Sequence, residues 1–447
     1  MSIKDSFNLH GLASRFDIKK LFKSQYARDA STLMVGTTLG MVIQLLSSPL
    51  LSRLYNDSAF GVLQLFSSTY AILSIIATLR YELAIMLPKS DDDAFCVLGA
   101  SCGCTVIFSA LCQLFVWGVR AFHISLFGLS ELSWLKYMPA ATLVMGLYYS
   151  FNYWLNRRKR YFNLAINRIV QNTLIVGLSI VFSSSLLHVA DGMVVAYILS
   201  MAIVTLLLVC YAIQDYRRLN LKISFKNIVT MAKRYRRFPI STMPTGLINN
   251  VAAQMPVYIL QHFFGDGIVG QYYMMNRVLG TPVSIIGQAI GDVFRQKSSS
   301  TYAENGECDH LYRTTAKALA LISIVPFILL MIVARPAFTF ILGDQWLLAG
   351  TFVILLAPFY FIRLVVSPLT IMTIVAEKQT YELIWQTTMF ILTSAAMLLS
   401  CTLLPASADS NLPYYTAMVA YATMYSIMYI LHFLYTRQLA KGRKLWG

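Results

Sequence analysis

The chain of 447 residues is 57% hydrophobic and only 13% charged, has a mean hydropathy of +0.61, and carries a net charge of +16. Soluble domains contain about a quarter charged residues, so this composition excludes an ordinary soluble protein and predicts a polytopic membrane protein. The first thirty residues lack an apolar core followed by a cleavage site, so we expect the first membrane helix to direct insertion. The seven cysteines show no zinc-site spacing, and we expect neither a metal site nor disulfides.

Twelve apolar stretches are long enough to cross a bilayer as helices. Their approximate limits are 31–53, 61–87, 94–118, 133–155, 162–186, 192–213, 239–263, 267–293, 315–340, 347–375, 380–403 and 412–435. The prediction is therefore an all-α integral membrane protein. A basic linker at 214–238, which we expect to be amphipathic and to lie on the membrane surface, divides the spans into two lobes of six. These are an N-lobe at 31–213 and a C-lobe at 239–436, flanked by a basic N-terminus at 1–30 and a C-terminus at 437–447.

Lysine and arginine are distributed asymmetrically between the two sides of the predicted membrane. With the N-terminus inside, inner segments hold 28 of the 36 and outer loops hold four; the remaining four lie inside spans. This positive-inside bias predicts that both termini are cytoplasmic. The net charge is then a signature of topology, so we do not expect nucleic acid as a partner.

The two halves share short motifs at corresponding points of the topology. The clearest pair places an aspartate four residues before a glycine, and two weaker pairs follow in the same order. The pairs are "YNDSAFG" at 55–61 with "FGDGIVG" at 264–270, "LFG" at 126–128 with "ILG" at 341–343, and "KRY" at 159–161 with "QTY" at 379–381. Because six spans is an even number, the halves should be related by a parallel pseudo-two-fold along the membrane normal, with a substrate cavity between them.

Five ionisable residues lie well inside predicted spans: the arginines Arg80, Arg168, Arg277 and Arg363, and the acid Glu82. A charge in hydrocarbon is costly, so such residues normally face a partner or a water-filled cavity. We expect the arginines to bind an anionic substrate, because the guanidinium fork suits phosphate and carboxylate oxygens. The alternative for Arg80 and Arg168 is that they extend to the inner headgroups.

Glu82 is the candidate site for ion coupling. Residues two apart do not share a face of a helix, so Arg80 is not the expected partner of Glu82, and Arg168 is. A structural ion pair alone remains an alternative to coupling.

Span seven is unusually polar and rich in proline, with Asn249, Asn250 and Gln254 near its middle. Broken polar helices are tolerated where they line a cavity, so we include these three as candidate substrate-binding residues. Hydrogen bonding between helices is the alternative.

Four stretches, "RYELAIMLPKSDDDA", "NYWLNRRKRYFNLAINRIVQN", "RFPISTMPTGLINN" and "MNRVLGTPVSIIGQAIGDVFRQK", resemble the Wzx-type polysaccharide flippases of the MOP superfamily. The resemblance extends over about 25–436. It implies a twelve-helix, two-lobe flippase of the bacterial inner membrane that moves undecaprenyl-diphosphate-linked oligosaccharide to the outer leaflet for O-antigen, capsule or exopolysaccharide assembly. It also implies alternating access driven by H⁺ or Na⁺, a cationic central cavity and a possible complex with a polysaccharide polymerase or ligase.

A MATE-like drug or cation antiporter is the alternative, although such a protein would favour an acidic cavity. No loop is large enough to hold a soluble catalytic core, so we expect neither an enzyme nor a cofactor.

Overall fold

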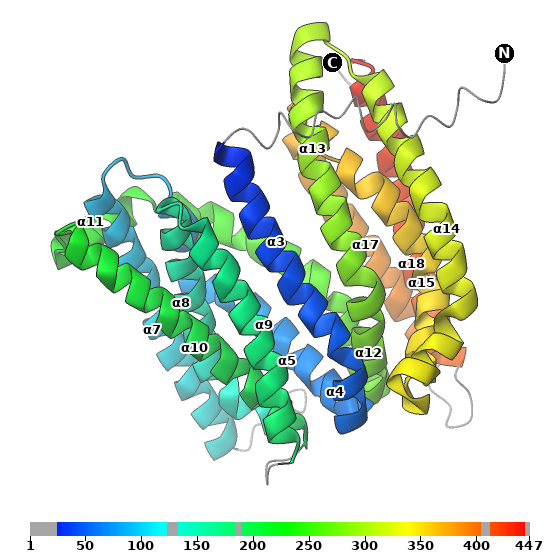
Figure 1. Cartoon of the computed structure of the whole chain (residues 1–447), viewed down its shortest axis with the longest axis horizontal. Coiled ribbons are helices and arrows are strands. Elements are labelled where there is room, and N and C mark those ends of the chain that lie inside the picture. The colour runs from blue at the N-terminus through cyan, green and yellow to red at the C-terminus, as the bar shows by residue number, and fades with distance from the viewer. Residues whose placement is uncertain (1–24, 123–132, 185–188, 404–411, 443–447) are drawn as a thin grey trace.

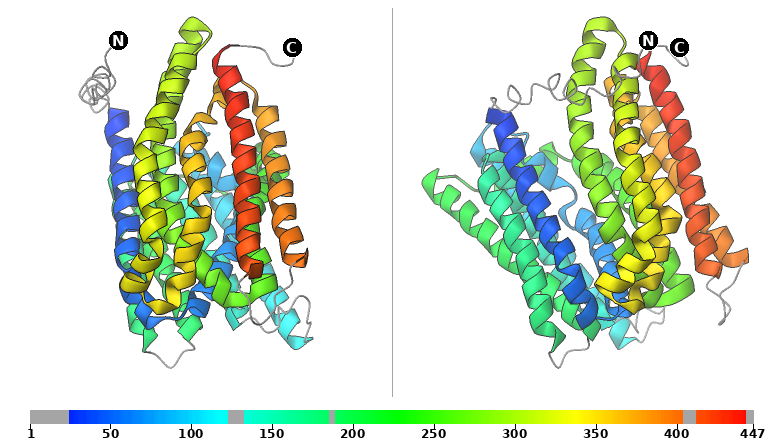
Figure 2. Two further views of the ribbon diagram at one scale, coloured as in Figure 1. Left: turned by 90° about the vertical axis from the view of Figure 1, so that its right-hand side faces the viewer. Right: turned by 45° about the vertical axis from the view of Figure 1, so that its right-hand side comes forward.

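The computed structural model describes residues 25–122, 133–184, 189–403 and 412–442. The described chain is helical, with no strands in these ranges. The helices form two bundles that lie side by side and diverge toward one end (Figure 1). The first α3 residues and the last α18 residues lie at that end (Figure 2), which we call the terminal end. The opposite end, where the bundles meet, is called the closed end.

The helices of the first bundle follow the predicted N-lobe spans. They are α3 (Gln25–Leu46), α4 (Ser48–Leu54), α5 (Asp57–Thr78), α6 (Tyr81–Ala84), α7 (Asp91–Ala121), α8 (Met138–Arg157), α9 (Tyr161–Ser183) and α10 (Val189–Arg218). The first span is bent by 42° between α3 and α4, where Pro49 follows the break. Because proline lacks a backbone N–H, it is tolerated at the first turn of the new helix.

The second bundle follows the predicted C-lobe spans in the same way. It contains α12 (Met243–Met275), the π-helix η5 (Asn276–Gly280), α13 (Thr281–Asn305), α14 (Asp309–Leu342), η6 (Asp344–Trp346), α15 (Leu347–Val366), η7 (Ser367–Leu369), α16 (Met372–Val375), α17 (Gln379–Leu403) and α18 (Leu412–Ala440). Gly265, with φ 78° and ψ −174°, interrupts α12 where spans seven and eight meet. Glycine adopts this backbone conformation without the strain that a Cβ would cause.

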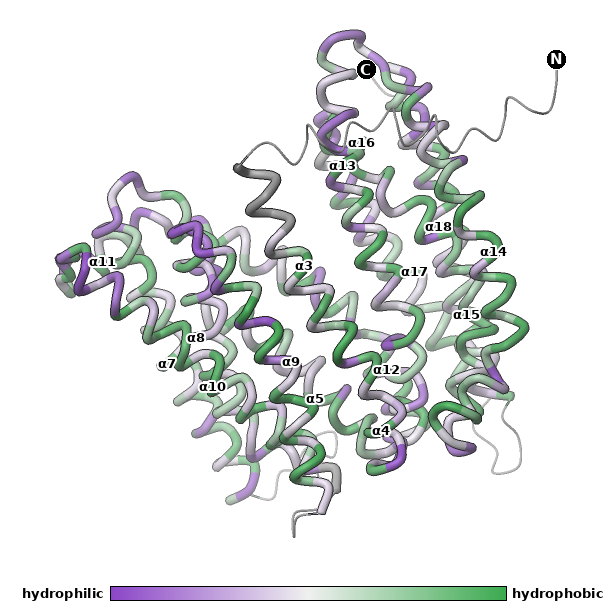
Figure 3. Tube along the Cα trace, in the orientation of Figure 1, coloured by the Kyte–Doolittle hydropathy of each residue, from purple (hydrophilic) through white to green (hydrophobic). Residues whose placement is uncertain are grey.

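Eight helical segments of the described chain are long and apolar enough to span a membrane alone, and the bent pair α3–α4 makes a ninth. The other three predicted spans, 133–155, 239–263 and 267–293, coincide with α8, α12 and α13, which are helical but more polar. All twelve predicted spans therefore have a helical counterpart. Hydrophilic residues gather on α11 (Phe225–Arg234) and at the α13–α14 turn (Figure 3).

The predicted amphipathic linker contains the helix α11, which packs against α7. Its Met231 is buried, and a Cβ at Gly99 of α7 would lie 3.1 Å from Cδ1 of Ile228. The Tyr81 hydroxyl also donates to the carbonyl of Ala232 (3.0 Å). The apolar face of the linker thus rests on the first bundle, and its basic side chains remain outside.

The two bundles meet most closely at the repeated aspartate–glycine motif. A Cβ on Gly61 would lie 1.9 Å from the carbonyl oxygen of Asp266, and a Cβ on Gly270 would lie 1.9 Å from that of Asp57. The contact is reciprocal, as two-fold symmetry requires, because each motif meets the other. The sequence repeat therefore marks the pseudo-two-fold, and only glycine allows the backbones to approach so closely.

Hydrogen bonds and ring contacts reinforce the closed end. Ser52 donates to the carbonyl of Leu342 (2.9 Å), and its own carbonyl accepts from Gln345 (2.5 Å) and from Trp346 Nε1 (3.4 Å). The fully buried rings of Phe60 and Trp346 pack edge to face with centroids 5.2 Å apart. The loop before α15 is thereby fixed to the first bundle.

Gln271 connects three segments at the same end. Its Nε2 donates to Asp57 Oδ2 (3.1 Å) and to the carbonyl of Gln345 (2.7 Å), and its Oε1 accepts from the backbone N–H of Ala349 (2.9 Å). A buried amide that uses both its donor and its acceptor groups is fully compensated for the loss of water.

Replacing Gly61 or Gly270 by alanine should force the crossing apart, because the new Cβ would meet a backbone carbonyl at 1.9 Å. Overpacking of this kind costs about 1–3 kcal/mol, so we expect each variant to unfold at a lower temperature than the parent protein in detergent. Gly177→Ala is the control, since no atom lies within 4 Å of a Cβ there. Unchanged melting of both crossing variants would contradict the tight contact.

Candidate functional site

Arg80 lies at a break in the second span. Leu79 and Arg80 both have left-handed backbone conformations, with φ of 49° and 61°. Each such residue costs about 1–2 kcal/mol. The break separates α5 from α6 and turns the Arg80 side chain back, so that its Nη1 lies 3.4 Å from Oε1 of Glu82. Our expectation that Glu82 pairs with another helix rather than with Arg80 is therefore wrong, because it assumed an unbroken helix.

Glu82 is only 3% exposed, and Arg80 is its ion-pair partner in the described chain. The expected pair of Glu82 with Arg168 is not found among the described residues. Arg80 also reaches the second bundle, since a Cβ on Gly246 of α12 would lie 2.6 Å from Arg80 Nη2. Arg80 is thus positioned between the bundles toward the terminal end.

Arg168 lies within the first bundle on α9. Its guanidinium lies over the ring of the buried Tyr148, with Cζ 5.5 Å from the centroid. A ring face attracts a cation and lowers the cost of its burial.

Arg277 lies on the π-helix η5 and connects the two bundles. It donates to the carbonyl of Gln44, where the bend between α3 and α4 begins, and approaches Ser47 Oγ (3.4 Å) and the Tyr273 hydroxyl (3.3 Å).

The shift of 209 residues that relates Gly61 to Gly270 also relates Ser68 to Arg277. Arg277 therefore occupies the same place in the second repeat that Ser68 occupies in the first.

The repeat counterpart of the Arg277 contact involves Gln254. Its Oε1 accepts from Ser68 Oγ (2.7 Å), and Thr69 and Tyr258 bond through their hydroxyls (3.0 Å) close by. Gln254 thus makes the hydrogen bond between helices that was the alternative to a cavity role.

The two asparagines of span seven lie on the same helix as Gln254. Asn250 is half-buried, whereas Asn249 is exposed and lines a cavity between α12, α17 and α18. The three polar residues of this span are therefore not gathered at one site.

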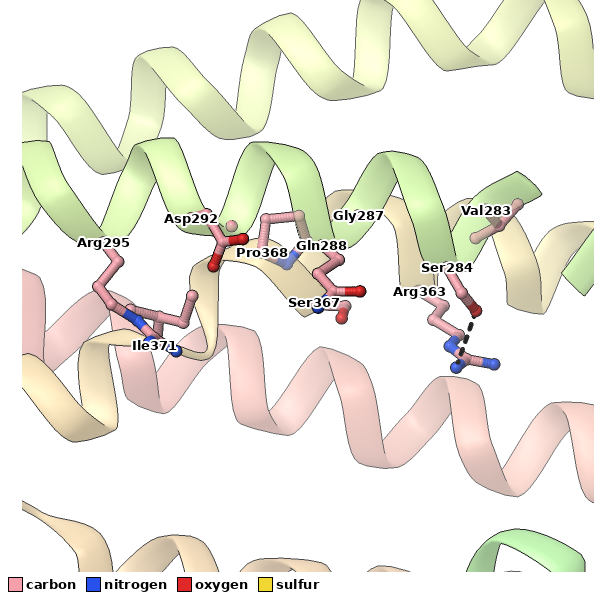
Figure 4. A pocket seen from close by; sticks show the side chains of 11 residues that line it. Val283, Ser284, Gly287, Gln288, Asp292, Arg295, Arg363, Ser367, Pro368 and Ile371 are labelled. Atoms are coloured by element: carbon pink, nitrogen blue, oxygen red, sulfur yellow. Dashed lines mark hydrogen bonds between the residues drawn. The ribbon is translucent and has the colours of Figure 1, made fainter. Parts of the chain in front are cut away.

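Arg363 faces a cavity of about 270 Å³ between α13 and the end of α15 (Figure 4). Ser284, Gln288, Asp292 and Arg295 project into this cavity from one face of α13. Their spacing of four, four and three residues forms a stripe about 16 Å long at 1.5 Å per residue. We call this site the cationic cavity, because its walls carry two arginines and one aspartate.

The charge of Arg363 is not neutralised by a carboxylate in the described chain. Its Nη2 lies 3.5 Å from Ser284 Oγ, and its Cζ lies 5.7 Å from the centre of the Tyr360 ring. Tyr425 and Tyr429 of α18 are further aromatic neighbours. Rings and hydroxyls reduce the cost of placing the cation here but leave its charge available to an anion.

Arg295 was not among the predicted site residues. The apolar run ends near 293, which predicted an inner loop at Arg295, whereas α13 continues to Asn305. The signal that could have identified it is the helical spacing of the polar residues between Ser284 and Arg295. These four positions are exposed, while Ile286 and Val293 lie exposed on another face of the helix.

Comparisons with known proteins agree with this architecture. The model of a family described as "Polysaccharide biosynthesis protein" matches residues 50–350. No curated protein sequence matches the chain. Among solved structures, an inward-facing multidrug resistance MATE family transporter of the MOP superfamily superposes with a TM-score of 0.69 at 14% identity, covering 91% of this chain and 96% of that one.

Two further structures have the same fold. The lipid II flippase MurJ in an inward closed conformation gives a TM-score of 0.68 at 14% identity, over 90% of this chain and 86% of its own. An outward-facing MATE transporter gives only 0.57 at 15% identity, over 94% of this chain and 97% of its own. The predicted two-lobe, MOP-like fold is therefore confirmed.

The Arg80–Glu82 pair should appear as a coupling energy in a double-mutant cycle. Arg80→Ala leaves a buried carboxylate without its partner, whereas Glu82→Gln removes the charge that requires one. We expect Arg80→Ala to be the more destabilising single change, and the double variant to be less unstable than the sum of both by about 0.5–3 kcal/mol. Strict additivity of the four melting temperatures would contradict the pair.

Proposed function

We propose that this chain, which belongs to the polysaccharide biosynthesis protein family and has a MOP-like membrane fold, is a lipid-linked oligosaccharide flippase. Its substrate would be an undecaprenyl-diphosphate-linked repeat unit, moved from the inner to the outer leaflet of the bacterial cytoplasmic membrane. The product would serve O-antigen, capsule or exopolysaccharide assembly, with a polymerase or ligase acting next.

The observation that carries this proposal is the cationic cavity, which lies among the helices of a protein that is 57% hydrophobic. Arg363 and Arg295 both line the cationic cavity, and Asp292 is the one acidic residue of its lining. A diphosphate carries two negative charges on oxygens that match the guanidinium fork. The stripe of α13 residues from Ser284, beside Arg363, to Arg295 is about 16 Å long. This length leaves room for the first sugar in addition to the diphosphate.

The arrangement of the two bundles supports a mechanism of alternating access. They diverge at the terminal end and are held together at the closed end by the glycine crossing and by Gln271. With both termini in the cytoplasm, as the positive-inside bias predicts, this arrangement would admit a lipid headgroup from the inner leaflet.

A MATE-like drug or cation antiporter is the second candidate, and the fold alone does not distinguish it. The charge of the cavity favours the flippase, because an organic cation would be repelled by Arg363 and Arg295. A MATE-like role would require an acidic site, and Glu82 is already paired with Arg80.

Ion coupling is proposed at Glu82, by H⁺ or Na⁺. Binding of an ion to this carboxylate would release Arg80, which contacts Gly246 of the other bundle. A ligand shifts a conformational equilibrium only through its different affinity for the two states. Glu82 satisfies this condition if its pairing with Arg80 differs between the inward and outward states.

Removing the arginine fork at Arg363 or Arg277 should abolish export. We expect Arg363→Ala and Arg277→Ala to reduce surface glycan at least about tenfold, equivalent to about 1.4 kcal/mol or more, while the protein still reaches the membrane. The lysine variants should keep part of the activity, because lysine retains charge but not the fork. The exposed Arg313, which is paired with Asp309, supplies the control Arg313→Ala. Normal glycan export by Arg363→Ala would reject the proposed substrate site.

The coupling proposal predicts that Glu82→Gln uncouples transport from an ion gradient. Transport of the lipid-linked substrate in vesicles should respond to an imposed pH or sodium gradient in the parent protein and not in Glu82→Gln. Glu304→Gln, at an exposed site on α13, is the matched control. If gradient-driven transport survives Glu82→Gln unchanged, the carboxylate is a structural partner of Arg80 only.

A further inference from the structure

A second cavity, of about 350 Å³, lies between α12, α17 and α18. Its aromatic lining includes Trp385, Phe390, Tyr425 and Tyr429. The rings of Tyr425 and Tyr429 stack with their centroids 5.8 Å apart, at an interplanar angle of 24°. We call this site the aromatic cavity. Its volume falls in the range of about 300–1,000 Å³ that small-molecule sites occupy, and such sites are lined mainly by aromatic side chains with a few polar groups.

The polar groups of the aromatic cavity are incompletely satisfied. His432 is only 3% exposed, and its Nε2 forms no hydrogen bond. It lies 3.4 Å from Oε2 of Glu382, with which it forms an ion pair when the imidazole is protonated, although neither atom has a hydrogen bond. Gln386 donates to the other carboxylate oxygen (2.9 Å). Buried polar atoms are normally hydrogen-bonded, and those that are not require an explanation.

The aromatic cavity lies close to Arg363 of the cationic cavity. Tyr425 and Tyr429 line the aromatic cavity, and both rings are neighbours of Arg363. The linings of the two cavities thus approach each other at Arg363. A ligand whose anionic group binds Arg363 would have its next group within reach of the aromatic cavity.

We propose that the aromatic cavity is a saccharide-binding subsite, which takes a neutral or N-acetylated hexose of the substrate. The proposal rests on the flippase function. A pyranose ring has an apolar C–H face that packs on aromatic rings, and its hydroxyl groups both donate and accept hydrogen bonds. Glu382 and His432, which face each other as an ion pair, each keep a polar atom without a hydrogen bond that a sugar hydroxyl would satisfy, and the exposed Asn249 supplies an amide on the α12 side.

A metal ion fits this cavity less well than a sugar. Among the described residues, no group of three or more His, Cys, Asp or Glu side chains is placed to hold a metal. Hard cations require several oxygen ligands at short distance, whereas this cavity offers one carboxylate and is otherwise lined mainly by aromatic rings. The room available is also many times the roughly 30 Å³ share of one water molecule.

The test is saccharide binding to the purified full-length protein in detergent, measured by saturation-transfer NMR. The probes are glucose, galactose, mannose, rhamnose, N-acetylglucosamine and N-acetylgalactosamine, with inorganic pyrophosphate as an independent probe of the cationic cavity. We expect at least one sugar to bind, and Trp385→Ala or Asn249→Ala to weaken that binding about tenfold or more. Ile384→Ala is the control, since Ile384 neighbours Trp385 but is 60% exposed and outside the lining.

Pyrophosphate separates this inference from the proposed function. Trp385→Ala should leave pyrophosphate binding unchanged, which also shows that the variant is folded, while Arg363→Ala should weaken it. If the parent protein binds sugar but not pyrophosphate, the result counts against the proposed diphosphate site and not against the saccharide subsite. The saccharide subsite is overturned if none of the six sugars binds, or if both cavity variants bind sugar as the parent does.

Discussion

The close approach of two backbones at Gly61 and Gly270 is the constraint on which the rest of the molecule depends. Each glycine faces the carbonyl of the aspartate from the other repeat, so the crossing can form only where neither helix carries a Cβ. This contact holds the bundles together at one end. The bundles diverge toward the other end, and Gln271 and Trp346 fix the surrounding loops. A single pair of glycines thereby determines which end of the protein is sealed.

The buried arginines show how the chain manages charge in an apolar environment. Arg168 lies over the ring of Tyr148, Arg277 donates to a backbone carbonyl, and Arg363 is surrounded by tyrosines. Rings and carbonyls carry no formal charge, so these partners lower the cost of burial without neutralising the cation. Of the four arginines predicted to lie inside spans, Arg80 alone has a carboxylate partner in the described part of the chain, at Glu82. The interior therefore keeps a net positive charge, which is what an anionic headgroup requires.

Hydropathy was sufficient to predict the spans. Backbone polar groups exposed to lipid are costly, and an apolar segment of this length satisfies them by forming a helix. The repeat was also readable, because its aspartate–glycine motif has a steric role that other residues cannot fill. The position of Arg295 was missed for a related reason. Hydropathy identifies the apolar part of a helix, whereas α13 continues through a polar segment to Asn305.

The break at Leu79 and Arg80 was not predictable from local sequence. Neither residue is a glycine or an asparagine, the types that usually adopt a left-handed conformation. Tertiary contacts stabilise the left-handed conformation instead. Arg80 pairs with the buried Glu82, and the Arg80 side chain also contacts Gly246 of the other bundle. Pairwise rules for helix faces cannot anticipate such a break. Our assignment of Arg168 as the partner of Glu82 failed for this reason.

The strained backbone at Arg80 suggests how binding of an anion at the terminal end can be coupled to the contacts at the closed end. A left-handed residue persists only where its surroundings determine its conformation, and the surroundings of Arg80 belong to both bundles. Arg363, by contrast, belongs to the second bundle alone. An anion within reach of both guanidinium groups would favour the state in which the bundles approach at the terminal end. The closed end is held by packing at the glycine crossing, by hydrogen bonds between neutral groups, each with a net value of about 1 kcal/mol, and by the bond of Gln271 to the Asp57 carboxylate. Contacts of this size can be exchanged for a new set at the other end without a large difference in free energy, and the proposed alternating access requires that balance.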